Sequence, residues 1–254
     1  MAAAHAIRHT DREVAIPSFL PRPSASPCRG RMRVRRIHNG MIHIFNIVED
    51  FDAAAGFRAV MPLIPKWRLD KAMAYRFDID RFLCAKSFML LEEMLHQDYG
   101  LGCCPEFSYG DNGKPYFRDY PDIFFSISHC HKGIACAVMD RPVGIDIEEI
   151  QYDEELAKVI FNAEELEAVR GADDPAEKFT EFWTRKESFL KLTGEGLRDN
   201  LKDVLSGADE AAITTGINRP AGYVYSTAIW KQDRPAGQFA IDCDCHNSYD
   251  CLSS

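Results

Sequence analysis

The chain has 254 residues, of which 46% are hydrophobic and 27% are charged, enough for one large domain or two small ones. Its formal net charge of -9 gives it no overall attraction for nucleic acid or an anionic membrane, so we expect neither as a partner. No apolar run approaches the roughly 20 residues that a membrane span needs. We therefore expect a soluble, cytoplasmic protein.

The nine cysteines do not follow the spacing of a metal or redox site. Cys103 and Cys104 are adjacent, whereas Cys243 and Cys245 are separated by one residue. His246 follows Cys245, but no second pair lies at the spacing of a zinc finger. We interpret the cysteines as reduced thiols, in agreement with a cytosolic location.

Residues 1–40 differ in composition from the rest and are interpreted as a basic, proline-rich extension. No acidic residue occurs between Val14 and Gly40, and four prolines in this stretch break regular structure. A transit peptide is the alternative, because such segments are rich in Arg and Ser, but no amphipathic helical period is present. A secretory signal is excluded because there is no apolar core. We expect the extension to pack poorly on the folded chain.

The hydrophobic pattern predicts strands and helices that alternate along the rest of the chain. Strands are predicted over 41–48, 123–128, 133–139, 143–148, 223–230 and 238–243, and helices over 81–95, 163–169 and 177–192. The first strand is mostly apolar and is expected to be buried on both faces. We predict an α+β fold with two similar lobes, an N-terminal lobe over 41–150 and a C-terminal lobe over 151–254.

The predicted strand 143–148 carries the first motif that indicates chemistry, Gly-Ile-Asp-Ile-Glu. Alternate residues of a strand share a face, so Asp146 and Glu148 point one way while Ile145 and Ile147 point the other. Two carboxylates that project together repel each other unless a cation or water separates them. A hard divalent ion accepts such oxygen ligands. The alternative is a strand end that simply enters solvent.

A second motif lies on the predicted helix 177–192 and the residues that follow it. It reads Trp-Thr-Arg-Lys-Glu-Ser-Phe-Leu-Lys-Leu-Thr-Gly-Glu-Gly-Leu from Trp183 to Leu197. Glu187 and Lys191 are four residues apart and share one helix face. A surface salt bridge is the simpler interpretation, and it would contribute only about 0.5 kcal/mol. Two glycines directly after the helix, which allow close backbone approach, indicate more than that.

A third motif, Phe-Ser-Ile-Ser-His, ends at His129 and follows the turn Gly113-Lys114-Pro115. Serine, histidine and lysine side chains near strand ends can donate hydrogen bonds to phosphate oxygens. The rival interpretation is a Ser-His hydrolase. It is disfavoured because the adjacent Ser128 and His129 cannot pair as nucleophile and base, and no Gly-x-Ser-x-Gly motif occurs.

Taken in order, these motifs resemble those of the large single-chain 4'-phosphopantetheinyl transferases of the surfactin-synthetase-activating type. The similarity covers about residues 41–245. The short trimeric acyl-carrier synthases of the same superfamily are about half this length. The chain therefore resembles their fused form, a monomeric pseudo-dimer with pseudo-twofold symmetry and an active site between its lobes.

The resemblance implies an enzyme that moves the phosphopantetheine arm of coenzyme A to a serine of an apo acyl or peptidyl carrier protein. The reaction is expected to need Mg²⁺ and to release adenosine 3',5'-bisphosphate. By resemblance, Asp146, Glu148 and Glu187 bind Mg²⁺, and Lys191 contacts the phosphate at the reacting end. Either Glu187 or a metal-bound water takes the proton of the carrier serine.

The remaining residues that the resemblance implies would bind coenzyme A. Ser128 and His129 match the contact to the 3'-phosphate region, and Gly113, Lys114 and Pro115 match the loop along the adenine. Arg81 matches an arginine on the 3'-phosphate. Lys66, Arg68 and Lys71 are the candidates for a further basic contact, and Arg68 is the one we select.

Two other functions stay open from the residues alone. A Mg²⁺-dependent phosphohydrolase acting on a coenzyme A-like pyrophosphate would use the same carboxylates and basic groups. A carrier-binding protein with an inactive site is disfavoured because all four acidic and basic site residues are present. Asp242 and Asp244 repeat the acidic pattern late in the chain, but no helix with a similar acid and base follows them. We expect these two aspartates to form a solvated strand end.

Overall fold

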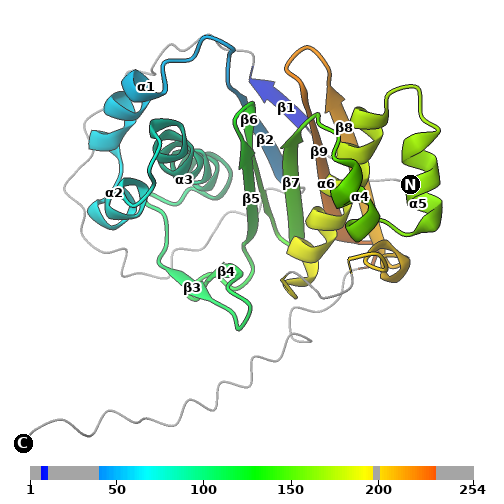
Figure 1. The fold of residues 1–254 in the computed structure, drawn as a ribbon. Helices are drawn as coiled ribbons and strands as arrows, with labels where there is room; N and C mark the ends of the chain where they lie inside the picture. Colours follow the sequence, from blue (N-terminus) through cyan, green and yellow to red (C-terminus); the bar gives the residue numbers. More distant parts are fainter. Residues whose placement is uncertain (1–6, 11–39, 197–200, 233–254) are drawn as a thin grey trace, which may run out of the picture.

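The computed structural model describes residues 7–10, 40–196 and 201–232, and its strands lie between two groups of helices (Figure 1). The predicted strand 238–243 lies outside the described residues, as do Asp242 in it and Asp244 just after it.

The N-terminal half is built on a four-stranded sheet. Its strands, in spatial order, are β1 (Ile7–Thr10), β2 (Met41–Asn46), β6 (Gly133–Met139) and β5 (Phe124–Cys130). Strand β1 pairs parallel to β2, while β6 pairs antiparallel to both β2 and β5. Strand β1 comes from the segment interpreted as an extension, so part of that segment adds an edge strand to the sheet.

Helices cover the outer face of this sheet. They are α1 (Ala53–Val60), the 3-10 turn η1 (Met61–Leu63), α2 (Lys66–Met73) and the long α3 (Asp78–Tyr99). The buried side of α3, including Phe88, Leu91 and Leu95, packs in one core with Phe125 and Ile134 of the sheet. Helix α3 ends at Gly100, whose φ of 66° suits a residue without a side chain. A short hairpin, β3 (Phe107–Tyr109) and β4 (Pro115–Phe117), follows.

The C-terminal half is built on a three-stranded antiparallel sheet of order β7-β9-β8. Its strands are β7 (Val143–Glu149), β9 (Tyr223–Trp230) and β8 (Ala211–Asn218). Its helices are α4 (Glu154–Ile160), α5 (Ala163–Arg170), α6 (Pro175–Thr193) and the 3-10 turn η2 (Leu205–Gly207). Helix α5 begins with a capping box between Asn162 and Glu165, which satisfies two backbone N–H groups.

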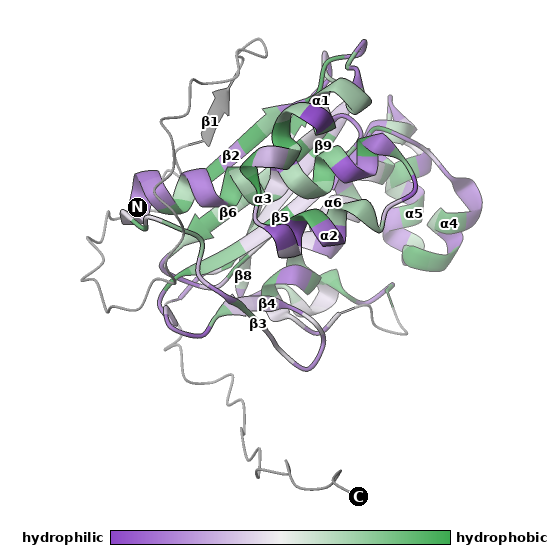
Figure 2. Ribbon diagram, turned by 90° about the vertical axis from the view of Figure 1, so that its left-hand side faces the viewer, coloured by the Kyte–Doolittle hydropathy of each residue, from purple (hydrophilic) through white to green (hydrophobic). Residues whose placement is uncertain are grey.

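The two sheets share a core that joins the halves. Ile42, Ile44 and Ala137 of the first sheet pack in one cluster with Ile145 and Ile147 of the second. The layers are therefore helices α1–α3, the first sheet, the second sheet and helices α4–α6 (Figure 1). Every residue of β6 is buried, because α3 covers one face of this strand and the second sheet the other. Strands β2 and β6 accordingly have mainly hydrophobic colours, whereas α2 is mainly hydrophilic (Figure 2).

The mixed α and β composition confirms the coarse fold prediction. The pseudo-twofold relation between two similar lobes stays a prediction, because the two sheets have four and three described strands and differ in their helices. The predicted helices 81–95 and 177–192 are each longer, at 78–99 and 175–193. Helices α1, α2 and α4 and strands β1, β3, β4 and β8 were not predicted. None of the described helices is both long and apolar enough to cross a membrane.

Candidate active site

Helix α6 lies very close to β7 because Gly144 has no side chain. A Cβ atom at this position would lie 2.0 Å from the carbonyl oxygen of Ser188 and 2.4 Å from the amide nitrogen of Leu192. Any larger residue would force the helix away from the strand. The close approach brings Glu187 and Lys191 of α6 beside the acidic residues of β7.

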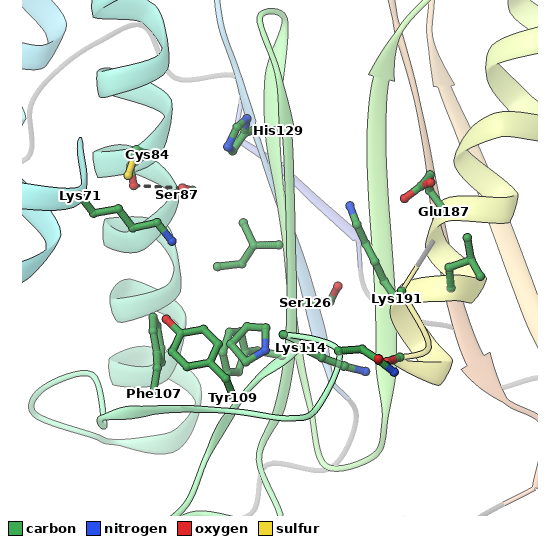
Figure 3. A pocket seen from close by; sticks show the side chains of 18 of the residues that line it. Lys71, Cys84, Ser87, Phe107, Tyr109, Lys114, Ser126, His129, Glu187 and Lys191 are labelled. Carbon is green, nitrogen blue, oxygen red and sulfur yellow. Dashed lines mark hydrogen bonds between the residues drawn. The ribbon is translucent and has the colours of Figure 1, made fainter. Parts of the chain in front are cut away.

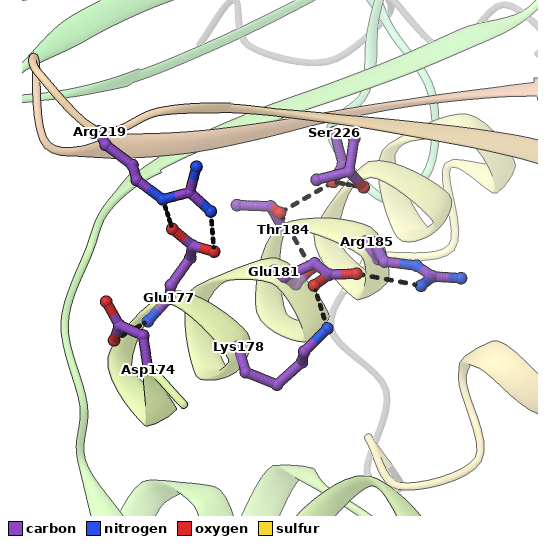
Figure 4. Close-up of polar contacts among 9 residues, drawn as sticks. Asp174, Glu177, Lys178, Glu181, Thr184, Arg185, Arg219 and Ser226 are labelled. Carbon is purple, nitrogen blue, oxygen red and sulfur yellow. Dashed lines mark hydrogen bonds and ion pairs between the residues drawn. The ribbon is translucent and has the colours of Figure 1, made fainter. Parts of the chain in front are cut away.

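Polar contacts fix the first half of α6 on the C-terminal sheet (Figure 4). The helix begins after Asp174, whose side chain accepts a hydrogen bond from the amide of Glu177 at 3.0 Å. The Glu177 carboxylate in turn accepts a 2.8 Å hydrogen bond from Arg219, in the turn between β8 and β9. Further along, the hydroxyl groups of Thr184 and Ser226 are 2.9 Å apart. These contacts orient the helix before it reaches the site.

Three elements meet at Asp146, which is only 2% exposed. The Lys191 ammonium donates to Asp146 Oδ1 at 2.6 Å and to Ser128 Oγ at 2.8 Å. The Ser128 hydroxyl donates to the same Oδ1 at 2.7 Å. Ser128 reaches this point because β5 lies beside β7, where the amide of Ile145 donates to Ser126 Oγ at 3.0 Å. The result is a compact triad of lysine, serine and aspartate.

The carboxylates around this triad outnumber the cations that face them. Burial and the nearby Asp146 raise the pKa of Glu148 to about 7, although Lys191 and a hydrogen bond from Trp183 act in the opposite direction. Burial and Asp146 also raise the pKa of Glu187, again against the effect of Lys191. Both shifts have the same cause: ionised carboxylates lie close together where water is partly excluded. The cluster would be stabilised by a further cation.

The donor set fits a hard divalent metal. The second oxygen of Asp146, Oδ2, is buried and makes no hydrogen bond. An oxygen in this position is costly to bury unless something binds it. Mg²⁺ takes oxygen ligands, usually one or two carboxylates together with substrate phosphates. Within the described ranges, however, no three acidic, His or Cys side chains are already arranged around a metal position.

A cavity of about 500 Å³ opens between the two halves of the molecule and reaches this cluster (Figure 3). One wall comes from α2 and α3 and the opposite wall from α6, and β5 and the turn after β3 line the cavity between them. Of the predicted site residues, Arg68, Gly113, Lys114, Pro115, His129, Glu187 and Lys191 line the cavity. Lys71, one of the alternatives to Arg68, also lines it.

The turn 110–114 lies against the end of α6. Lys114 Nζ donates to the carbonyl of Leu192 at 3.1 Å, and Asn112 Nδ2 donates to that of Gly194 at 3.1 Å. Gly194 ends the helix with a φ of 74°, and a Cβ there would lie 3.1 Å from the Lys114 side chain. Burial lowers the pKa of Lys114 to about 8, so the amine stays mostly protonated at pH 7.

Other predicted residues lie elsewhere. Ser128 is tied to Asp146 and Lys191 and is not among the cavity-lining residues, nor are Asp146 and Glu148. Arg81 also lies outside the lining; its guanidinium donates to Asp78 at 2.8 Å and to the carbonyl of Tyr75 at 3.0 Å. Lys66 forms an exposed pair with Asp70 instead of facing the cavity.

His129 and Arg68 face the cavity from two sides. Burial, Lys191 and Arg68 together lower the pKa of His129, which favours the neutral imidazole. Arg68 donates to the carbonyl of Cys84 at 2.6 Å and lies near Ser87 Oγ, which anchors the guanidinium on α3. The cavity therefore combines fixed positive charge with neutral hydrogen-bonding groups.

Comparison with known proteins connects this site to one family. A family model described as the 4'-phosphopantetheinyl transferase superfamily matches residues 142–240, which include both β7 and α6. The 4'-phosphopantetheinyl transferase psf-1 of Bacillus pumilus is 32% identical over 169 residues, covering 64% of this chain and 72% of that protein. The chain belongs to the 4'-phosphopantetheinyl transferase superfamily. This confirms the family, and the class of enzyme, predicted from the ordered motifs.

Other relatives match over a shorter stretch. The 4'-phosphopantetheinyl transferase Sfp of Bacillus subtilis (strain 168) is 38% identical over 94 residues, which is 36% of this chain and 42% of that protein. The 4'-phosphopantetheinyl transferase gsp of Aneurinibacillus migulanus is 39% identical over 95 residues, which is 36% of this chain and 39% of that protein. The matched part thus spans less than half of these two relatives.

In this phosphopantetheinyl transferase, Lys186 has a different task from its neighbour Glu187. Its side chain is 0% exposed and pairs with Glu165 of α5 at 2.9 Å. The ammonium also donates to the carbonyls of Leu201 and Lys202, at 2.9 and 3.2 Å. Lys186 therefore holds α5, α6 and the chain after α6 together, away from the cavity.

The aromatic end of the cavity was not predicted from the sequence. Phe107, Tyr109 and Phe125 line it, and the rings of Phe107 and Phe125 stack with centroids 5.4 Å apart. The signal was present as the alternation Phe-Ser-Tyr just before the turn 110–114. Three residues were too few to identify a strand by periodicity, because short apolar runs are ambiguous.

Proposed function

We propose that this enzyme transfers the 4'-phosphopantetheine group of coenzyme A to a serine of an apo acyl or peptidyl carrier protein, in a Mg²⁺-dependent reaction. The observation that carries the proposal is the acidic cluster with Lys191 at one end of a cavity whose other end is basic and aromatic. A molecule with a pyrophosphate, a further phosphate and a planar base matches these groups in charge and shape. Coenzyme A has all three.

Two regions of the cavity would bind different parts of coenzyme A. Arg68 and Lys71 line the cavity on the side of α2 and α3, where negative phosphates would be neutralised, and Lys114 lines it at the end of α6. Phe107 and Tyr109 offer faces on which a base can stack. The pyrophosphate would then lie towards Glu187 and Lys191, on the opposite wall.

In the reaction, the oxygen of the carrier serine attacks the β-phosphorus of coenzyme A. A bond forms between that oxygen and phosphorus, and the bond from phosphorus to the leaving adenosine 3',5'-bisphosphate breaks. Glu187 lines the cavity, and its carboxylate can accept the serine proton. Lys191 can stabilise the charge that grows on the phosphoryl oxygens.

Asp146, Glu148 and Glu187 are the residues that would hold Mg²⁺. When bound, the ion would neutralise pyrophosphate charge that Lys191 alone cannot balance. The unbonded Oδ2 of Asp146 and the raised pKa values of both glutamates support this assignment. The monomeric state and the cytoplasmic location expected from the sequence stay predictions.

The test is incubation with coenzyme A, Mg²⁺ and a panel of apo-carrier proteins, followed by intact mass measurement. We expect one carrier to gain the mass of phosphopantetheine while adenosine 3',5'-bisphosphate appears in equal amount. Omission of Mg²⁺ with a chelator present should stop both. A carrier whose target serine is replaced by alanine serves as the matched control.

The phosphohydrolase alternative makes a different forecast for the same assay. Coenzyme A would be consumed at the same rate with or without a carrier, and no carrier would gain mass. That result would overturn the transferase proposal even if Mg²⁺ were required.

A comparison of Arg68→Ala with Arg81→Ala tests which arginine binds the 3'-phosphate. Because Arg68 lines the cavity and Arg81 does not, we expect Arg68→Ala to weaken coenzyme A binding by about tenfold or more and Arg81→Ala to have a small effect. Binding of dephospho-coenzyme A should be insensitive to Arg68→Ala. A larger loss in Arg81→Ala would restore the assignment made from the sequence.

A further inference from the structure

The Lys191 side chain faces two regions at once. Its ammonium lies 2.6 Å from Asp146 Oδ1 and 2.8 Å from Ser128 Oγ. The same side chain lines the cavity on the α6 wall, beside Glu187 (Figure 3). It is 30% exposed, whereas Asp146 is 2% exposed. The Lys191 ammonium can therefore move away from Asp146 into solvent, whereas the buried Asp146 carboxylate stays where it is.

Asp146 is the only one of the three carboxylates that Lys191 binds directly in the described structure. Its Oδ1 already accepts two hydrogen bonds, from Lys191 and Ser128. A divalent cation that uses this carboxylate would lie within a few ångströms of the ammonium. Like charges at such a distance repel strongly where water is partly excluded.

We propose that Lys191 is a built-in counter-cation which the divalent metal displaces from Asp146, so that metal binding releases the ammonium into the cavity. The inference rests on the proposed function. Before substrate arrives, Lys191 neutralises a buried carboxylate that would otherwise be unpaired. Once the metal is bound, the ammonium is repelled towards the cavity, where the phosphates of coenzyme A would lie. Metal binding therefore comes first, and the Lys191 ammonium becomes available to the phosphates of coenzyme A after it.

Ser128 holds the Asp146 carboxylate in place while the metal replaces Lys191. Its hydroxyl donates to Asp146 Oδ1 and accepts from Lys191, so one of the two bonds to Oδ1 remains when the lysine departs. A serine in this position keeps the carboxylate oriented through the exchange. This accounts for a hydroxyl that the structure places at the acidic cluster and outside the cavity lining.

The first test measures Mn²⁺ binding to the full chain without coenzyme A, by electron paramagnetic resonance or calorimetry. We expect Lys191→Met to tighten Mn²⁺ binding about tenfold or more, because the substitution removes a positive charge that lies beside the metal site and repels the ion. Lys114→Met removes another cavity cation that does not contact Asp146, and it should change the dissociation constant less than twofold. Asp146→Asn identifies the signal that belongs to this site.

The second test measures the displacement itself. Trace acetylation followed by peptide mass spectrometry should show Lys191 of the wild type labelled several-fold faster when Mg²⁺ is present. Lys66, exposed on α2, is the internal reference and should not change. In Asp146→Asn the Mg²⁺ effect on Lys191 should disappear.

Four results would overturn the proposal. Equal Mn²⁺ affinity of wild type and Lys191→Met would show that the metal binds without opposing the lysine. Equal tightening of Mn²⁺ binding in Lys114→Met would show that any cavity cation opposes the metal by its charge alone. Lys191 labelling that does not change with Mg²⁺ would show that the ammonium is not released. Absence of Mn²⁺ binding at Asp146 in all variants would show that no divalent metal competes with Lys191 for this carboxylate. The mass-gain assay decides the transferase function separately from each of these.

Discussion

Helix α6 carries charged residues on two sides, and the two sides are organised differently. On one side Lys186 is completely buried, and its ammonium is matched by Glu165 and two backbone carbonyls. On the other side Glu187 and Lys191 join Asp146 and Glu148, and one ammonium faces three carboxylates. Lys186 and Glu187 are adjacent in the sequence.

The contrast shows how a fold separates structural from functional charge. A buried ion pair whose hydrogen bonds are all made is rigid, and removal of one partner is costly. A cluster with excess negative charge is less stable by itself and gains from any cation that enters it. Burial alone does not identify a site. The imbalance between the acidic groups and their partners does.

The largest effect is expected on the unbalanced side, from Asp146→Ala. Loss of this carboxylate removes both the partner of Lys191 and a proposed metal ligand, so transfer should fall about 10³-fold or more. The free energy of unfolding should change little, because one of three mutually repelling carboxylates is removed and Lys191 is already partly exposed. The mass gain of the carrier protein measures the transfer rate, and urea unfolding measures the free energy of unfolding. A folded variant with near-normal turnover would contradict the site assignment.

Lys186→Met tests the balanced side and should give the opposite result. It leaves Glu165 buried without its partner, which we expect to cost about 3–5 kcal/mol of unfolding free energy. Transfer by the molecules that remain folded should be nearly normal, since Lys186 does not face the cavity. The double variant Lys186→Met with Glu165→Gln should recover part of the stability. An unchanged unfolding midpoint in the single variant would mean that the pair is dispensable.

Gly144→Ala should disturb both sides through the position of α6. The added methyl group would lie 2.0 Å from the carbonyl of Ser188, so the helix must move. We expect a loss of about 1–3 kcal/mol in stability and a lower turnover, because Lys191 is carried away from Asp146. Gly207→Ala is the matched control, since nothing lies within 4 Å of its Cβ position. Equal effects of the two substitutions would rule out the close approach as their cause.

Lys114 gives the smallest effect, which appears in the pH dependence of stability. Its pKa is lowered to about 8 in the folded protein from 10.5, so between these values the unfolded chain binds the additional proton. Stability therefore rises with pH in this window, by at most about 1 kcal/mol from pH 8 to pH 9. Urea unfolding at both pH values should show the rise in wild type and not in Lys114→Met. Lys66→Met, an exposed control, should keep it.

The sequence alone determined the features that lie within single elements. The alternation in residues 144–148 placed Asp146 and Glu148 on one face of a strand, and the isoleucines do lie in the core between the sheets. The spacing of Glu187 and Lys191 put them on one face of a helix. The order of the motifs was enough to name the family. Strand and helix periods are local, so they can be read without knowing the fold.

Only the tertiary structure decided how those elements meet. It brought Ser128 to Asp146 across two neighbouring strands, and it turned Lys186 towards Glu165. It placed Arg68, and not Arg81, in the cavity lining. These choices depend on contacts between residues far apart in the chain, such as the approach of α6 to Gly144. No local period encodes such contacts, because they arise from the packing of whole elements against one another.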